Sequence, residues 1–555
     1  MRALLIYPIF PKSFWSFEKA LELVNRKALL PPLGLITVAA ILPQTWEFRM
    51  VDRNVGEIIE ADWDWAEIVI LSAMIVQKED FLAQIQAAKQ RGKRVAVGGP
   101  YPTALPGEAE ASGADFLILD EGEITLPMFV AAVEQGETSG IFRANGERPS
   151  VELTPIPRFD LLDKTAYDLM ALQFSRGCPF QCEFCDIIVL YGRKPRTKTP
   201  EQLIAELDRL LELGFDQGVF LVDDNFIGNK RNVKLLLPAI KAWSQRHNYP
   251  FRFLTEASID LAQDPELMDM MVEANFHAVF LGIETPDEAS LTLTRKFQNT
   301  RDSLSESVNS ITRKGLRVMA GFIVGFDGEK SGAGDRIVQF VEKTAIPTAM
   351  FSMLQALPDT ALWHRLQKEG RLLEQTTANI NQTTLMNFIP TRPMEEIARE
   401  YVDGFWQLYD SHQFLDRIYR YYLMLGTESP IRDAKKSAGS VGQVLSWTTV
   451  RALSILVWRQ GIKRSTRLKF WIYLFRIMGQ NPKFWVDYLK ICGHFEHFSE
   501  YRQLVRDNIE TQLAEFLEQQ SRLQSASIGI TEVKANEVKA NDVTVKEVTV
   551  SESAA

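Results

Sequence analysis

Ser175-Arg-Gly-Cys178-Pro-Phe-Gln-Cys182-Glu-Phe-Cys185 holds three of the four cysteines of this sequence within eight residues. In a chain with so few cysteines, such crowding favours metal ligation or redox chemistry over disulfide formation. The C-x3-C-x2-C spacing allows three thiolates to bind three irons of a 4Fe-4S cluster, which leaves one iron without a protein ligand. A zinc site or three unrelated buried thiols are the alternatives, but zinc needs a fourth ligand, and the nearest downstream candidates are His247 and Cys492.

The cysteines follow the first of six short apolar segments that alternate with helical patterns such as 200–214 and 230–246. Repeats near the ~30 residues of a βαβ unit predict parallel strands in a partial (β/α)6 barrel over 169–390. Ligands of such a sheet lie at the carboxyl ends of its strands. The six predicted strands are Leu172–Ser175, Gly218–Val222, Phe251–Glu256, Ala278–Ile283, Arg317–Val324 and Thr348–Leu354.

The remaining chain divides by pattern into four further segments. Residues 1–140 alternate strand and helix and predict a doubly wound α/β domain, whose strands are expected at 2–7, 47–51, 67–72, 94–98 and 115–119. A Pro-containing linker over 141–168 follows. Helical periodicity, first clear from Met394 to Tyr409, predicts a helical domain over 391–524, and near-repeats poor in large side chains predict a disordered tail over 525–555.

Composition restricts the classes of function. The 555 residues are 46% hydrophobic and 24% charged, which is typical of folded globular chains. A net charge of -9 gives no overall footprint for nucleic acid. No apolar run reaches the roughly 18 residues of a membrane span, and the start reads as a buried strand followed by Pro8 and Pro11, so we expect a cytoplasmic protein.

The cysteine stretch resembles the cluster motif of the radical S-adenosylmethionine (SAM) superfamily, and the resemblance extends over roughly 170–360. It implies that the open iron binds the methionine portion of SAM and that an electron donor protein reduces the cluster. Carboxylates at strand ends can accept hydrogen bonds from ribose hydroxyls or an amino group, and glycine allows close approach, although the same residues also cap helices and end strands. The SAM-contacting positions implied are Phe184, Asp223, Asp224, Glu256, Ser258, Glu284, Gly321 and Gly325.

The first ~135 residues resemble the cobalamin-binding domain of one radical SAM subgroup, through Pro31-Pro-Leu-Gly-Leu-Ile-Thr37 and later strand-end motifs. Small residues at strand ends suit a large planar ligand laid across a sheet edge, and any other doubly wound domain is the alternative. The first histidine of the chain is His247, so we expect cobalamin without a histidine ligand from this domain. The implied cobalamin contacts are Leu33, Gly34, Ser72, Gly98, Gly99, Glu121, Gly122 and Glu123.

Together the resemblances imply a cobalamin-dependent radical SAM C-methyltransferase acting on an unactivated carbon of an apolar small molecule or lipid. Stretches such as Phe14-Trp-Ser-Phe17 and Pro195-Arg-Thr-Lys-Thr199 look like the hopanoid C-2 methylase group, which points to a hopanoid methylated at C-2. Three alternative functions stay open. They are a ring-forming or oxidative enzyme, methylation of a tetrapyrrole or another lipid, and a non-catalytic cobalamin or redox sensor. No side chain stands out as a catalytic acid or base.

A basic and aromatic strip covers 434–486. The sequence between Asp433 and Asp487 contains no acidic residue, and its Lys and Arg residues alternate with Trp447, Trp458 and Trp471. Such a strip can hold a helix against anionic lipid headgroups, which predicts peripheral contact with the inner face of a membrane. Alternatively, the aromatic residues of the strip belong to the core and its charged residues form a solvated face, or the strip is a docking surface for another protein.

Overall fold

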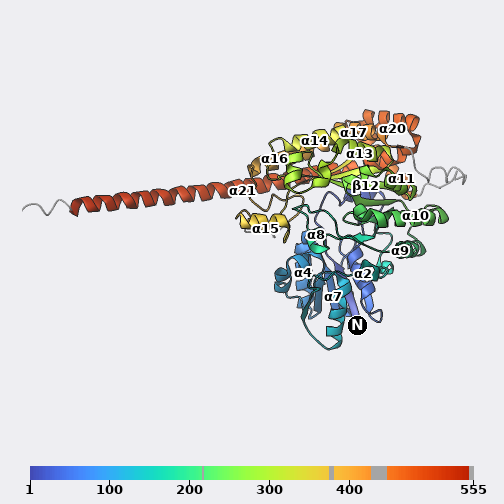
Figure 1. Cartoon of the computed structure of the whole chain (residues 1–555), viewed down its shortest axis with the longest axis horizontal. Coiled ribbons are helices and arrows are strands. Elements are labelled where there is room, and N and C mark those ends of the chain that lie inside the picture. Colours follow the sequence, from blue (N-terminus) through green and yellow to red (C-terminus); the bar gives the residue numbers. More distant parts are fainter. Residues whose placement is uncertain (216–217, 374–379, 427–446, 549–555) are drawn as a thin grey trace, which may run out of the picture.

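The computed structural model describes residues 1–555 apart from 216–217, 374–379, 427–446 and 549–555, and for 447–449 and 523–548 it describes the backbone only. Two parallel sheets and a helical region make up the body, and helix α21 (Trp485–Val548) extends far beyond it (Figure 1). The predicted α/β class, with a C-terminal helical domain, is confirmed. None of the helices in the described part of the chain combines the length and apolarity needed to cross a bilayer.

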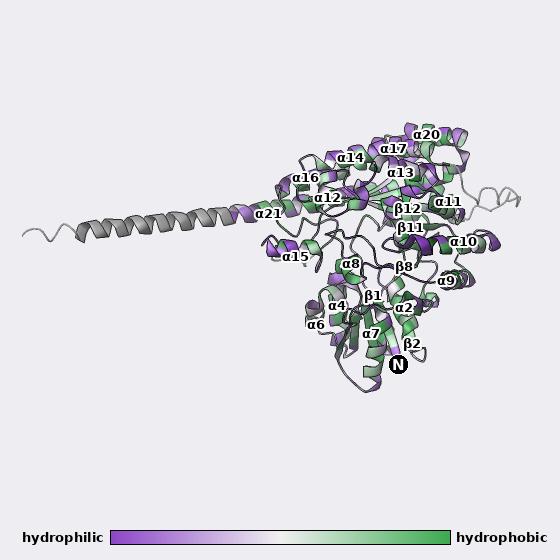
Figure 2. Ribbon diagram, viewed as in Figure 1, coloured by the Kyte–Doolittle hydropathy of each residue, from purple (hydrophilic) through white to green (hydrophobic). Residues whose placement is uncertain are grey.

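The N-terminal sheet has six parallel strands in the order β2-β1-β3-β4-β5-β6. The apolar runs of β1, β3, β4 and β5 are buried on both faces, as expected where helices cover a parallel sheet. Helices α2 and α7 are hydrophobic along most of their length (Figure 2). The strands are β1 (Arg2–Tyr7), β2 (Glu47–Asp52), β3 (Ile68–Ser72), β4 (Arg94–Gly98), β5 (Phe116–Ile118) and β6 (Gly140–Phe142); the helices are α1 (Glu18–Leu23), α2 (Leu33–Ile41), α3 (Glu60–Trp65), η1 (Ile75–Gln77), α4 (Lys78–Gln90), α5 (Pro100–Ala104), α6 (Pro106–Ala111) and α7 (Gly122–Glu134).

All five strands predicted for this domain are present within one residue, whereas β6 was missed. Strand β6 is only three residues long and lies at the sheet edge, where its half-exposed side chains give little apolar signal. The following segment contains only the short turns η2 (Val151–Leu153) and η3 (Phe159–Leu161).

The second sheet carries its strands in sequence order, β7-β10-β11-β12-β13-β14, all parallel. This order, with helices on the outer face, is that of an open, partial barrel. The strands are β7 (Leu169–Leu172), β10 (Gly218–Leu221), β11 (Phe253–Ala257), β12 (Phe276–Glu284), β13 (Arg317–Val324) and β14 (Thr348–Met353), and β8 (Ser175–Arg176) with β9 (Arg196–Thr197) forms a separate short ribbon; the helices are α8 (Ile187–Leu190), α9 (Pro200–Glu212), η4 (Phe226–Asn229), α10 (Lys230–Arg246), η5 (Ile259–Gln263), α11 (Pro265–Glu273), α12 (Glu288–Leu293), η6 (Phe297–Thr300), α13 (Leu304–Arg313), α14 (Ala333–Thr344) and α15 (Ala361–Lys368).

The C-terminal region is helical, as the sequence predicts. It contains α16 (Met394–Leu408), α17 (Ser411–Met424), α19 (Trp447–Leu456), the π-helical η7 (Val457–Lys463), α20 (Arg467–Gln480), η8 (Pro482–Phe484) and α21. The backbone of 525–548 continues α21, where composition predicts a disordered tail. The repeats lack large side chains for a core, but their Glu, Lys and Ala residues are good helix formers.

One short N-terminal segment joins the barrel to the helical region. The Phe14 ring stacks on Phe498 of α21 with centroids 4.7 Å apart. The neighbouring Trp15 points into the barrel, where its indole N–H lies 3.2 Å from the Met350 sulfur and its ring centroid lies 5.5 Å from that of Phe280. These contacts fill the inner face of the barrel near the amino ends of its strands with apolar side chains.

Candidate functional site

The three clustered cysteines lie in the loop between β8 and α8, at the carboxyl edge of the barrel sheet. The Asn225 amide lies 3.9 Å from the Cys178 sulfur, and the Gln298 amide lies 3.7 Å from the Cys182 sulfur. Burial raises the pKa of Cys178 and of Cys185. Within the described residues no three His, Cys, Asp or Glu side chains converge as the ligands of one metal ion must, whereas the thiolates of a 4Fe-4S cluster each bind a different iron. The spacing of the three free cysteines and their common loop at the sheet edge fit the ligands of such a cluster.

The residues after β10 fix this loop to the sheet. Asp223 accepts hydrogen bonds from the Phe174 backbone N–H at 2.7 Å and the Ser175 hydroxyl at 3.0 Å, and burial raises its pKa to about 7. Asp224 accepts from the Gly177 N–H at 3.4 Å, and burial raises its pKa to about 6. Asp223 has both oxygens engaged by the strand that leads to the cysteines, so its carboxylate positions the loop.

Glu256 and Ser258 follow β11. Ser258 hydrogen-bonds the Asn225 side chain at 3.2 Å and so contacts the cysteine loop indirectly. The Glu256 carboxyl has no hydrogen-bond or ion-pair partner among the described residues. Burial, followed by the charges of Asp224, Asp223 and Glu284, raises its pKa to about 8. A half-buried carboxyl without a partner at a strand end is suited to bind a hydroxyl or amino group of a ligand.

Glu284 ends β12 and is ion-paired with Lys296. It adopts a left-handed backbone conformation with φ 64°, which turns its side chain back over Gly282, where a Cβ atom would lie 2.5 Å from the Glu284 carboxylate. The Lys296 ammonium also lies 5.7 Å from the Phe184 ring centroid. The ion pair thus connects β12 to the cysteine loop. Sequence analysis missed Lys296 and Gln298 because neither belongs to a recognisable motif spacing.

The two predicted glycines of β13 have different surroundings. A Cβ atom on Gly321 would lie 3.0 Å from the Phe280 ring, inside the barrel. Gly325 has φ 95°, donates its N–H to Glu329 at 2.8 Å and lies under Met386. Gly321 therefore borders the apolar interior, while Gly325 packs against the C-terminal part of the chain.

The predicted cobalamin contacts Ser72, Gly98 and Gly99 meet at the carboxyl edge of the N-terminal sheet. A Cβ atom on Gly99 would lie 2.5 Å from the Ser72 hydroxyl, and one on Gly98 would lie 2.7 Å from the Ile118 carbonyl oxygen. Leu33 and Gly34 begin α2, and the space beside Gly34 is open. Gly98 and Gly99 therefore allow β3, β4 and β5 to pack closely at this edge, and the open space for a ligand is beside Gly34.

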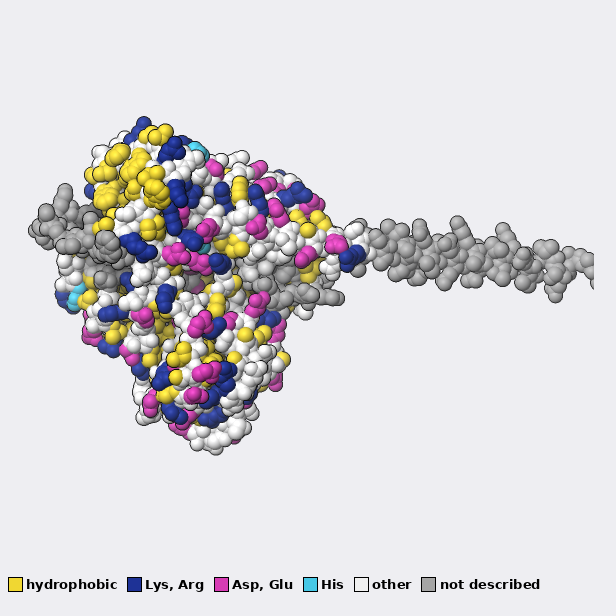
Figure 3. Space-filling model, turned by 180° about the vertical axis from the view of Figure 1, so that it is seen from behind, with side chains coloured by type: hydrophobic (Ala, Val, Ile, Leu, Met, Phe, Trp, Pro, Cys, Tyr) yellow, Lys and Arg dark blue, Asp and Glu magenta, His cyan; other side chains and the backbone are white. Residues whose placement is uncertain are grey.

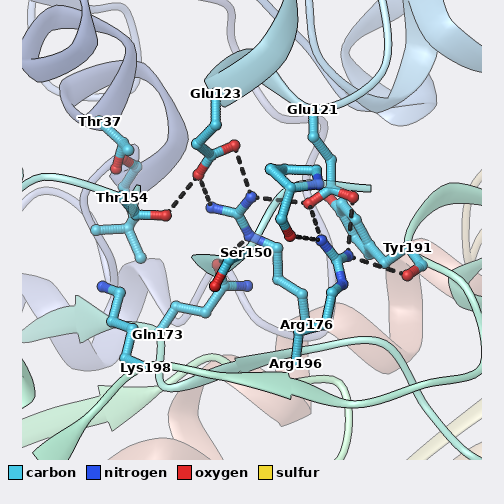
Figure 4. Close-up of polar contacts among 12 residues, drawn as sticks. Thr37, Glu121, Glu123, Ser150, Thr154, Gln173, Arg176, Tyr191, Arg196 and Lys198 are labelled. Atoms are coloured by element: carbon cyan, nitrogen blue, oxygen red, sulfur yellow. Dashed lines mark hydrogen bonds and ion pairs between the residues drawn. The ribbon is translucent and has the colours of Figure 1, made fainter. Parts of the chain in front are cut away.

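Glu121 and Glu123, also predicted cobalamin contacts, instead engage arginines of the barrel domain (Figure 4). Arg176 lies 3.0 Å from Glu121 and 2.8 Å from Glu123, and Arg196 lies 2.8 Å from Glu121. Burial alone would raise the pKa of Glu123, but the hydrogen bonds and charge of Arg176 hold it below its ordinary value. Gly122, between the two acids, begins α7. Arg176 is two residues from Cys178, so this network places the two sheet edges against one another.

Comparison with known proteins matches three parts of the chain to families. Residues 22–130 match the B12 binding domain, residues 172–341 match the Radical SAM superfamily, and residues 360–511 match a domain of unknown function (DUF4070). The first range contains β2 to β5 of the N-terminal sheet, and the second contains β10 to β13 of the barrel sheet. All the predicted cobalamin and SAM contacts lie within these two ranges.

Similar proteins extend over nearly the whole chain. An uncharacterized methyltransferase of Synechocystis sp. is 62% identical over 537 residues, or 96% of this chain and 98% of its own. The hopanoid C-2 methylase of Rhodopseudomonas palustris is 34% identical over 485 residues, or 86% of this chain and 89% of its own. The structure of the methyltransferase TsrM from Kitasatospora setae, with cobalamin and a 4Fe-4S cluster bound, has a similar fold, with a TM-score of 0.57 and 14% identity over 90% of this chain and 99% of that one.

Proposed function

This chain belongs to the cobalamin-binding radical SAM family of methyltransferases, and from that premise we propose that it methylates an unactivated carbon of an apolar lipid, with a hopanoid at C-2 as the first candidate. The cofactors of the family are a 4Fe-4S cluster, SAM and cobalamin. The observation that carries the proposal is the Arg176 network, because it brings the edge suited to cobalamin against the edge that holds the cysteines.

The residues at the barrel edge have distinct roles in this proposal. Cys178, Cys182 and Cys185 hold the cluster, and the amides of Asn225 and Gln298 lie near two of the three sulfurs. Glu256 accepts a hydrogen bond from bound SAM, since it is the strand-end carboxyl that has no partner among the described side chains. The bound cofactors together supply a hydrogen-abstracting radical and a transferable methyl group.

The barrel interior supports an apolar substrate and the exclusion of water. Trp15, Phe280 and Met350 line it beneath the acidic edge, and Gly321 adds no side chain there. A carbon radical formed next to such a surface meets few groups that could quench it. The 34% identity to a hopanoid C-2 methylase over most of both chains supports a triterpenoid as the occupant of this region.

Mass spectrometry of membrane lipids tests the proposal. A hopanoid-producing host without C-2 methylation is given this gene together with a cobalamin supply, and in parallel the Cys182→Ala variant. The expected result is a hopanoid heavier by one methyl group in its A ring, formed with the intact protein and absent with the variant.

Two other outcomes carry information. If protein with an intact cluster and bound cobalamin yields no methylated hopanoid, the hopanoid assignment is wrong, and pigments and other lipids become the candidates. If the reconstituted protein binds SAM but does not cleave it under reducing conditions, the chain is a sensor and the enzymatic proposal itself fails.

A further inference from the structure

Large apolar side chains are exposed together on η7 and α20, at the side of the helical region away from both sheet edges. Figure 3 shows them as a continuous hydrophobic patch with Lys and Arg side chains beside it. The exposed fractions reach 71% for Leu468, 62% for Phe475 and 52% for Trp458. We call this patch the α20 surface; it consists of Trp458, Ile462, Leu468, Ile472, Phe475 and Met478.

The exposed side chains are not needed for the core of the helical region. On α20 they recur at spacings of four, three and three residues, which places them on one side of the helix. The opposite side already packs inward through Phe470, Leu474 and Ile477, all less than 7% exposed. Helix α20 is therefore apolar on two sides, and within the described part of the chain no contact covers the side chains of its outer side.

The charged side chains that η7 and α20 themselves carry are all Lys or Arg. Lys463, Arg467 and Arg476 have no acidic partner among the described residues, and the sequence from 434 to 486 contains no Asp or Glu. The Lys463 ammonium lies 5.8 Å from the Trp458 ring centroid. By contrast, Lys469 of the same helix is paired with Asp416 at 2.8 Å. The unpaired cations thus border the exposed apolar patch.

We propose that the α20 surface docks this protein on an anionic lipid bilayer, with the apolar side chains in the headgroup region and the unpaired cations against lipid phosphates. The absence of acidic residues complements a negative surface, and tryptophan beside Lys and Arg is the composition favoured at a membrane interface. The inference concerns a surface outside the cofactor edges, so it does not depend on which substrate is methylated.

Vesicle sedimentation with the full-length protein tests this docking. The binding of wild type is compared on phosphatidylcholine vesicles and on vesicles with about a third phosphatidylglycerol, at low and high salt. We expect binding to the anionic vesicles that weakens with salt. Replacing Leu468→Ser and Phe475→Ser together lowers the vesicle affinity about tenfold or more, and replacing Lys463→Gln and Arg467→Gln together lowers it by about fivefold per charge at low salt.

Leu235→Ser on α10 is the matched control, because Leu235 is 61% exposed on a different face. It should bind vesicles as the wild type does, and circular dichroism should show that every variant is folded. Equal binding to both vesicle types, no binding at all, or wild-type binding by the Leu468→Ser, Phe475→Ser variant overturns the proposal. A dimer that this variant dissociates also overturns it, because the surface is then a contact between proteins.

Discussion

Buried acidic side chains lie at the carboxyl ends of both parallel sheets, but their surroundings differ. At the N-terminal sheet, Glu121 and Glu123 are paired with Arg176 and Arg196 from the neighbouring domain. At the barrel sheet, Glu256 has no partner among the described side chains, and burial raises its pKa to about 8. Paired buried charges stabilise an assembled interface, whereas an unpaired one costs stability that a ligand can recover. Glu121 and Glu123 therefore join the two domains, whereas Glu256 is available to bind a ligand.

The largest effect is expected at the cysteines, on the barrel side of the comparison. Cys182→Ala should abolish cluster assembly and SAM cleavage, because two thiolates hold a 4Fe-4S cluster poorly. Iron content and visible absorption after anaerobic reconstitution measure this. Cys492→Ala is the control: Cys492 is fully buried in α21, away from the motif, and its variant should keep the cluster. A normal iron content in the Cys182 variant would contradict the assignment.

Arg176→Met removes an arginine that pairs with Glu121 and Glu123 at the N-terminal sheet edge. It leaves Glu123 buried with Thr154 as its one side-chain hydrogen-bond partner among the described residues, and breaking a buried pair costs about 3–5 kcal/mol. The pKa of Glu123 lies below its ordinary value in the folded protein, so this stabilisation is present above pH ~4.5 and is lost as the pH falls through the folded-state pKa.

Urea unfolding at several pH values measures both effects of Arg176→Met. Arg209→Met is the control, because the Arg209–Glu212 pair is 40% and 65% exposed and is worth at most about 1 kcal/mol. Equal losses in the two variants would mean that the interdomain network contributes no more than a surface pair.

Glu256→Gln tests whether the Glu256 carboxyl, which has no partner among the described residues, costs stability and binds SAM. Because the folded-state pKa of Glu256 is about 8, the unliganded wild type should lose stability as the pH rises from ~4.5 to 8. The variant should lack this slope, be more stable at pH 8 by up to about 4 kcal/mol, and bind SAM roughly tenfold or more weakly. Unfolding curves and calorimetric titration with SAM measure these quantities. Glu273→Gln, an exposed position paired with Lys241, should change neither, and no change in Glu256→Gln would refute its assignment to SAM.

The smallest effects are expected for two glycine variants at the N-terminal sheet edge, which test where cobalamin binds. Gly99→Ala places a Cβ atom 2.5 Å from the Ser72 hydroxyl at φ 94°, which should cost about 1–3 kcal/mol and lower cobalamin affinity. Gly34→Ala adds a Cβ atom to open space within α2 and should stabilise the helix by about 0.5–1 kcal/mol. Visible-absorption titration with cobalamin compares them: reduced affinity in the Gly34 variant would place the ligand over α2, and unchanged affinity in both would remove it from this edge.

The sequence alone determined the alternation of strands and helices. Short apolar runs separated by helical patterns are compatible with few folds other than parallel sheets covered by helices. It also determined the cysteine site, because three close cysteines in a chain with four are informative without any tertiary contact. The basic and aromatic composition of 434–486 was equally evident from the sequence, although the difference between buried Phe470 and exposed Phe475 was not.

Tertiary structure decided which acids are paired. Glu121 and Arg176 are 55 positions apart, and nothing in the local pattern of either indicates that one charge neutralises the other. The same holds for Trp15, which enters the barrel beside Met350, 335 positions away. Local sequence sets backbone preference and burial, but the pairing of buried charges and the filling of an interior depend on which surfaces the assembled domains bring together.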